Sequence, residues 1–144
     1  MTNFEFLLLS MNLRIKALNT MLSQSVLFAT APTTDVARTT AFYQDKLGLK
    51  VMHSDDDGIA FEAGKGTSIY LYKRAPSKAD HTIASFMVDN MEKEVADLKA
   101  KGVRFEEYDM PGMKTVNGIA TWGKDKAAWF KDPDGNIIGL FQKG

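Results

Sequence analysis

The amino-acid sequence predicts an α+β fold made of two tandem βαβββ modules. Two helix patterns recur with the same internal length, from Asp35 to Gly48 and from Asp89 to Gly102. Each pattern is preceded by one strand-like segment and followed by three, with turn-forming residues between the strands. Such a repeat indicates a duplicated supersecondary unit. We therefore expect one domain over residues 25–142, with modules at about 25–74 and 80–142.

The first module begins with a predicted strand over Ser25–Thr30. Asp35 then caps a helix whose inner face is formed by Val36, Thr40, Tyr43 and Leu47. Gly48 ends this helix, because glycine accepts the left-handed conformation that commonly follows a helix. Three strands are expected next, over Leu49–Ser54, Gly58–Ala63 and Thr67–Lys73, joined by turns at Asp55–Gly58 and Gly64–Gly66.

The second module repeats this plan. Its helix begins at Asp89 or Asn90, ends at Gly102, and has an inner face of Met91, Val95 and Leu98. The strands expected after it are Val103–Tyr108, Ala127–Lys131 and Asn136–Phe141. The turn Asp132–Gly135 has proline and glycine where a hairpin needs them, so we interpret it as a turn and not as a calcium site.

Residues 109–122 form a long segment that the first module lacks. Long loops in compact domains are often lids or binding loops. Met110, Met113 and Trp122 would give this one adaptable apolar contacts to a ligand. The same side chains would equally well plug one end of the sheet, so both interpretations stand.

Residues 1–24 differ from the rest of the chain. Apolar residues recur at helical spacing from Phe4 to Leu22, which predicts an amphipathic helix. The apolar run Phe6–Leu9 is too short to span a bilayer, and no basic segment precedes it as in a secretory signal. Met11 and Met21 are alternative starts. We expect a dispensable or loosely docked helix rather than one that binds a membrane surface or a partner.

The composition excludes several functional classes. The chain has 18 basic and 18 acidic residues and therefore no net charge to hold a nucleic acid. It has no cysteine, which excludes disulfides, thiolate metal sites and cysteine nucleophiles. The sequence also has no serine nucleophile elbow, phosphate loop or dinucleotide-binding motif. A cytoplasmic protein is expected.

Two motifs carry a family resemblance. The first is Phe42-Tyr43 followed by Leu47-Gly48-Leu49, and the second is the segment 128–136 with its Asp-Pro-Asp-Gly turn. Together with the repeat, they resemble the vicinal oxygen chelate superfamily, which includes glyoxalase I, extradiol dioxygenases, and fosfomycin- and bleomycin-resistance proteins. The resemblance covers Ser25 to Gln142. It implies a curled mixed sheet, in two half-barrels around a cleft, and a homodimer.

In the metal-dependent members of that superfamily, cleft positions carry ligands such as histidine or glutamate. The resemblance transfers four such positions onto Phe28, Tyr70, Ile83 and Gly139, and none of these binds a divalent metal well. We therefore expect no metal and no other cofactor. A displaced site would have to use residues that each stand alone. These are His53, Glu62, His81, Glu106 and Glu107, of which His81 is the strongest candidate because it shares a strand face with Ile83.

The same replacements predict an apolar cleft with a phenol group. Its expected lining is Phe28, Tyr70, Tyr72, Ile83, Met110, Met113, Trp122, Gly139 and Phe141. Phe61, Phe86 and Trp129 fit core positions under the helices equally well. The leading hypothesis is therefore a metal-independent protein that binds a small, largely apolar molecule, similar to the bleomycin-resistance type.

Two other functions stay open. The first is an enzyme, either a glyoxalase-like lyase or dioxygenase-like enzyme with relocated metal ligands, or a metal-free catalyst with His81 or Tyr70 as its acid–base group. The second is an interaction module whose N-terminal helix binds a partner. Neither has a motif of its own in the sequence.

Overall fold

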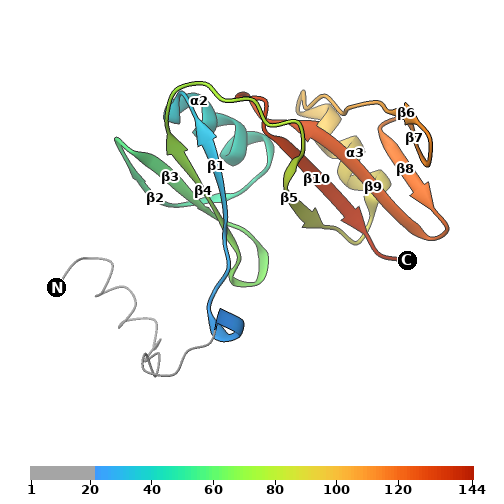
Figure 1. Ribbon diagram of the computed structural model, residues 1–144, viewed down its shortest axis with the longest axis horizontal. Coiled ribbons are helices and arrows are strands. Elements are labelled where there is room, and N and C mark those ends of the chain that lie inside the picture. The colour runs from blue at the N-terminus through green and yellow to red at the C-terminus, as the bar shows by residue number, and fades with distance from the viewer. Residues whose placement is uncertain (1–21) are drawn as a thin grey trace.

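A computed structural model describes residues 22–144 as two mixed sheets with helices on one side (Figure 1). In Figure 1 the sheets lie side by side, α2 and α3 lie behind the strands, and residues 74–81 cross from one sheet to the other at the top. The α+β prediction is confirmed. Most of the predicted N-terminal helix, with its alternative starts, lies outside the described residues. No helix in the described part is long and apolar enough to cross a membrane.

The first sheet has the strand order β1-β4-β3-β2. Its strands are β1 (Ala29–Thr33), β4 (Ser68–Lys73), β3 (Gly58–Glu62) and β2 (Lys50–Asp55). β1 runs parallel to β4, and the other pairs are antiparallel. The predicted strand at Ser25 begins only at Ala29, because Ala29 pairs with Ile69 at the start of β4 and earlier residues have no strand to pair with. A short 3₁₀ turn, η1 (Leu22–Gln24), precedes it.

The first helix forms where the sequence predicts it. Its first turns, α2 (Val36–Thr40), continue without a break into wider π-helical turns, η2 (Ala41–Lys46). Asp35 caps the helix by accepting a hydrogen bond from the Arg38 amide at 3.0 Å. The wider turns are closed by a bond from the Leu47 amide to the Phe42 carbonyl, five residues back. Gly48 then takes a φ of +74°, as the sequence predicts.

The second sheet has six strands in the order β5-β10-β9-β8-β7-β6. They are β5 (Thr82–Met87), β10 (Ile137–Gln142), β9 (Asp125–Lys131), β8 (Ile119–Trp122), β7 (Met113–Val116) and β6 (Asp109–Met110). α3 (Met91–Ala100) follows β5, is capped by Asn90, and buries Met91, Val95 and Leu98 as predicted. A short 3₁₀ turn, η3 (Gly64–Gly66), joins β3 to β4 in the first sheet.

The predicted strand Val103–Tyr108 is wrong. Only Phe105 pairs there, in an isolated bridge to Phe130, and β8 occupies the place next to β9 instead. β8 comes from the segment interpreted as a loop, which extends the sheet rather than lying over it or plugging its end. Asn117 and Gly118 both have positive φ and make a tight hairpin turn between β7 and β8. This Asn-Gly pair is the sequence signal that our interpretation missed.

The core lies between the helices and the two sheets and joins both modules. Tyr43 of η2 stacks on Phe61 of β3 at 5.3 Å between ring centroids. Phe42 of the same helix packs against Phe130 of β9 at 6.2 Å. Since Phe61 and Phe130 belong to different sheets, one short helix connects the two halves of the core.

The turn Asp132–Gly135 between β9 and β10 also joins the modules. Gly135 has the predicted positive φ of +84°. The Asp134 carboxylate accepts hydrogen bonds from the Thr34 amide at 2.9 Å, the Thr33 hydroxyl at 2.8 Å and the Arg38 guanidinium at 2.9 Å. These groups lie just before α2 and in its first turn, where Asp35 is the cap, so Asp134 ties the last turn of the chain to the start of this helix. The turn is therefore structural, as predicted, but it acts across the module boundary.

Candidate binding face

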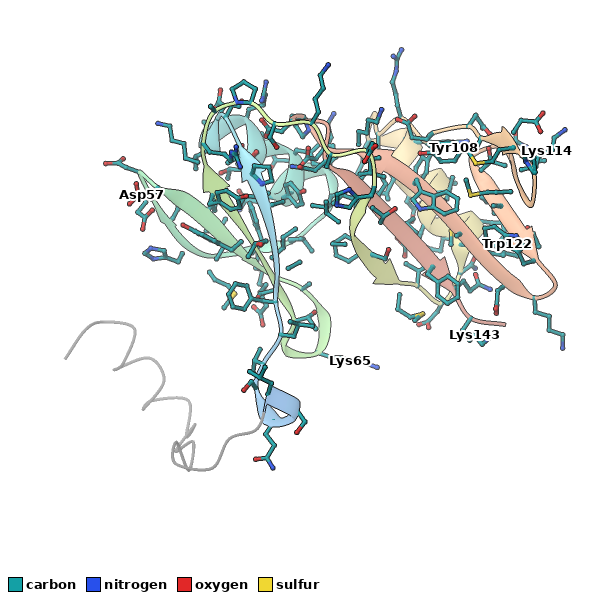
Figure 2. All side chains as sticks on the ribbon, in the orientation of Figure 1. Asp57, Lys65, Tyr108, Lys114, Trp122 and Lys143 are labelled. Atoms are coloured by element: carbon teal, nitrogen blue, oxygen red, sulfur yellow. The ribbon has the colours of Figure 1, made fainter. Side chains whose placement is uncertain are left out.

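The sheets have one face that no helix covers, and we call it the open face. Along β4, Ile69 and Leu71 are buried toward the helices, so Tyr70 and Tyr72 point the other way. Along β9, Ala128 and Phe130 are buried, which places Trp129 on the open face. In Figure 2 the labelled Tyr108 lies on this side, in front of the second sheet. The open face thus gathers side chains from both modules.

On the first sheet, a row of paired residues crosses the open face. Thr30 lies opposite Tyr70, Tyr70 opposite Ala60, and Ala60 opposite His53. Tyr70 is half-buried, and its hydroxyl lies 2.7 Å from where a Cβ on Gly58 would stand. The Tyr70 ring therefore lies across β3, over the glycine, which explains why residue 58 has no side chain.

His53 forms a hydrogen-bonded pair with Asp55 at the edge of this row. Its Nε2 lies 2.8 Å from Asp55 Oδ2, and both side chains are exposed. Asp55 also accepts bonds from the amides of Asp57 and Gly58 in the turn that follows β2. The hydrogen bond from His53, followed by the turn amides, holds the pKa of Asp55 below its usual range. This arrangement orients an imidazole on the open face.

On the second sheet, three aromatic rings form a group. Trp129 is contacted edge-to-face by Tyr108 at 5.6 Å and by Trp122 at 6.4 Å between centroids. The Trp122 indole donates to the Gly112 carbonyl at 2.9 Å, which ties the β6–β7 hairpin to the aromatic group. Burial, and then the nearby Glu106 carboxylate, raise the pKa of the Tyr108 hydroxyl, so it stays a neutral donor.

Gly139 lies beside Ser85 in the register of β10 and β5. A Cβ added to Gly139 would stand 2.5 Å from the Ser85 hydroxyl. The space that we expected Gly139 to leave for a ligand is therefore filled by Ser85.

The other predicted site residues are dispersed. Phe28 precedes β1 and is 51% exposed, while Thr30 is the residue that pairs with Tyr70. Ile83 lies at a bulge and packs against the core, while Ser85 pairs with Gly139. Tyr72 and Phe141 are half-buried on the open face, Met110 is exposed on β6, and Met113 is half-buried on β7. The structure thus places Trp122 in the aromatic group. Phe28 and Ile83, by contrast, do not pair with the strand residues that were expected beside them.

The residues considered for a displaced metal site also lie apart. His81 is exposed and contacts only Asp80, at 3.6 Å, among the ion pairs of the described residues. Glu106 lies 3.7 Å from Lys131, and Glu107 accepts a 2.5 Å hydrogen bond from Thr115. Glu62 is exposed at the end of β3. Within residues 22–144, no three histidine, aspartate or glutamate side chains come close enough to hold a metal ion.

A divalent metal does not fit Tyr70, Gly139 and the residues that pair with them, Thr30 and Ser85. Thr30 and Tyr70 offer neutral hydroxyls, Ser85 offers another, and Gly139 offers no side chain. First-row metals with open coordination sites need about three good nitrogen or carboxylate donors from the protein. We therefore derive no chemical step through a metal.

Two open-face residues, Trp129 and Tyr108, were not predicted as site residues. Trp129 was interpreted as possible core, although its alternation with the apolar Ala128 and Phe130 already signals the opposite face. Tyr108 was assigned to a strand that does not form. Its position depends on the hairpin that follows, which only the Asn-Gly turn could have indicated.

The chain is similar to a known family over nearly all of the described residues. Residues 25–140 match the family model described as Glyoxalase/Bleomycin resistance protein/Dioxygenase superfamily. No curated protein matches the sequence.

Solved structures share the fold. An antibiotic binding protein from a Streptomyces species is 22% identical with a TM-score of 0.62, over 87% of this chain and all of that one. A lactoylglutathione lyase from Agrobacterium tumefaciens is 17% identical with a TM-score of 0.62, over 83% and 93%. A fosfomycin resistance protein from Listeria monocytogenes is 18% identical with a TM-score of 0.61, over 84% and 94%. At these identities the likeness concerns the fold alone.

Proposed function

This chain belongs to the Glyoxalase/Bleomycin resistance protein/Dioxygenase superfamily, and on that premise we propose that it binds a small, largely apolar molecule on its open face without a catalytic metal. The group of Trp129, Trp122 and Tyr108 carries the proposal. Aromatic rings left on an uncovered sheet face offer a large apolar contact area with few rotamers to fix. The Tyr108 hydroxyl provides a polar atom beside it.

The antibiotic-binding relative supports the ligand class. A protein that sequesters a compound needs contact area and shape, whereas one that activates a metal-bound substrate needs a ligand set. The aromatic group of this chain supplies contact area, and the residues paired with Tyr70 and Gly139 supply no metal-ligand set. On the same grounds we propose that the protein acts by binding. We also propose a cytoplasmic location, with which the absence of cysteine from the sequence is compatible.

We further propose that the chain forms a homodimer. Apolar side chains are exposed before β1, where Val26 is 67% and Leu27 89% exposed, and at Val51 and Met52 on β2. Every residue of the edge strand β2 is exposed. Exposed apolar groups beside an unpaired strand edge favour association with another chain. Sedimentation velocity over a concentration series tests this proposal, and a monomer at all concentrations would contradict it.

Tryptophan fluorescence tests the ligand proposal directly, because the only two tryptophans of the sequence, Trp122 and Trp129, both belong to the aromatic group. Titration with naphthol, a planar apolar probe, is expected to quench this emission in a saturable manner. Trp129→Leu is expected to weaken naphthol binding, whereas Phe28→Leu, outside the group, is the control and leaves it unchanged. Unsaturable quenching, or equal affinity in the two variants, would contradict the proposal.

Acid–base catalysis is the second candidate, and the His53–Asp55 pair favours it. A carboxylate that fixes the tautomer of an imidazole is a common arrangement for a general base. Lactoylglutathione lyase activity is a suitable assay, given the lyase among the similar solved structures. Loss of turnover in His53→Gln, with His81→Gln unaffected, would establish this function. No turnover by the wild-type protein, with or without added divalent metal, would dismiss it for this substrate.

A further inference from the structure

The helix side of the protein has a half-open cavity, lined mainly by apolar side chains, that the open-face function does not use. It has a volume of about 180 Å³ and lies where the first module meets the second. Its walls include Leu47 and Leu49 from the first module, and Phe86, Val88 and Leu98 from the second. The buried core residue Phe130 lies beside it. An apolar cavity of about 150 Å³ is large enough to hold a benzene ring.

One carboxylate lies among these apolar side chains. Glu94 shares the inner stripe of α3 with Met91, Val95 and Leu98, which are all buried, and it lines the cavity. Helical spacing would favour an apolar residue at this position, because the residues one and four positions after it lie on the same stripe and face the core. A polar residue in such a place is a common mark of a functional site.

Glu94 has no cationic partner within the described residues. Its neighbour Lys93 pairs with Asp97 at 2.6 Å, and Glu92 pairs with Lys126. No lysine, arginine or histidine of residues 22–144 lies within 4 Å of the Glu94 carboxylate. A half-buried negative charge at the edge of an apolar cavity attracts a cation that also has an apolar body.

We propose that this cavity between the modules binds a small aromatic or aliphatic ammonium compound, with its apolar part against Leu49 and Leu98 and its ammonium group on Glu94. The residues of this site are distinct from those of the aromatic group on the open face. Met87, which is 71% exposed at the cavity, can adapt to ligands of different outline.

Benzylamine is the probe for this site, because its ring fits the volume and its amine is protonated at neutral pH. Methyl NMR of the full chain is expected to show saturable shifts at Leu49, Leu98 and Met87, with a dissociation constant in the millimolar range that is typical of so small a ligand. Benzyl alcohol, which lacks the charge, is expected to bind about tenfold more weakly.

Three variants separate the proposal from its alternatives. Glu94→Gln keeps the shape and is expected to reduce benzylamine affinity about tenfold without changing that of benzyl alcohol. Glu92→Gln is the matched control, since it removes the same charge from the same turn of α3 outside the cavity. Leu49→Phe fills the cavity and is expected to abolish binding of both compounds.

Several results would overturn the proposal. Three such results are the absence of saturable shifts, equal affinity for benzylamine and benzyl alcohol, and equal losses in Glu94→Gln and Glu92→Gln. A fourth is a shift of the Trp129 indole N–H, recorded in an amide spectrum, without shifts of the Leu98 methyls. Shifts of the cavity methyls with protein concentration alone would show that a second copy covers the cavity. Naphthol binding to the open face is unaffected by these variants, so the two proposals fail or succeed separately.

Discussion

Removal of one hydroxyl group tests how strongly the last hairpin is held to the first helix. Tyr43 is fully buried, and its hydroxyl donates to Asp132 Oδ2 at 2.8 Å. Asp132 is itself 5% exposed and also accepts from the Asn136 side chain and from the amides of Asp134 and Asn136. We expect Tyr43→Phe to destabilise the protein, because it deletes a hydrogen bond to a buried charge without removing the ring.

The size of the loss follows from the hydrogen bonds that remain. Hydrogen bonds to charged groups contribute roughly 1.5–3 kcal/mol, and Asp132 keeps three other donors. The expected loss is therefore about 2 kcal/mol at neutral pH. Urea unfolding should show a lower midpoint with an unchanged slope. Tyr70→Phe is the control, since the Tyr70 hydroxyl lies on the open face.

The stability lost in Tyr43→Phe should also depend on pH. Burial outweighs the bonds from Asn136 and Tyr43 and raises the pKa of Asp132, so the folded state binds its proton more tightly than the unfolded state. Ionisation of Asp132 therefore costs stability as the pH rises above the ordinary Asp value of about 3.9. Without the Tyr43 hydroxyl this cost increases, so the effect is larger at neutral pH than near pH 3.9. A loss below about 0.5 kcal/mol, or one equal to that of Tyr70→Phe, would refute the reasoning.

Four other changes have expected outcomes. Asp134→Ala should cost about 2 kcal/mol at neutral pH by thermal unfolding. Burial alone would raise the pKa of Asp134, but bonds from Thr34 and Thr33 and the charge of Arg38 hold it below its usual range. The stability that ionised Asp134 contributes is present above the ordinary Asp pKa and is lost as the pH falls through the lowered value. The stabilities of the variant and the wild type should therefore converge in acid. A difference that stays constant with pH would contradict this prediction. Gly58→Ala should cost about 2–3 kcal/mol, since its Cβ would stand 2.4 Å from the Leu71 carbonyl oxygen. Gly139→Ala should cost less than about 1 kcal/mol, because the Ser85 hydroxyl can rotate away. Equal losses of unfolding free energy in Gly58→Ala and Gly139→Ala, measured by urea unfolding, would contradict this difference. Deletion of residues 1–24 should leave the circular dichroism spectrum and melting temperature of the domain unchanged, as expected for a dispensable extension.

The architecture could be predicted from the sequence because its signals are local. Asp35, Gly48, Asn90 and Gly102 mark the helix ends through capping and positive φ, and these depend only on nearby residues. The repeat of helix and strands then fixes the order of elements. Boundaries that depend on pairing were less accurate, as at Ala29, where the partner strand sets the start.

The candidate site was predicted in part, for physical reasons. Tyr70, Tyr72 and Trp122 lie on the open face because alternation along a strand fixes their side. Ile83 does not pair with β10, because a bulge shifts the register in a way that sequence alternation does not reveal. The contacts of Tyr108 with Trp129, and of Asp134 with α2, join residues far apart in sequence, and local patterns carry no information about them.

The Asp132–Gly135 turn has a consequence for the order in which the protein acquires its structure. The hydrogen-bond partner of Thr33 lies 101 positions later in the chain, and that of Tyr43 lies 89 positions later. During synthesis on the ribosome, the first module therefore emerges before the carboxylates that its helix needs. The Tyr43 hydroxyl and the start of α2 stay hydrated until the final hairpin leaves the exit tunnel. The release of these last residues then completes the contacts of the first module, and a chain that stops before Asp132 is expected to be cleared by proteases rather than to persist as a half-domain.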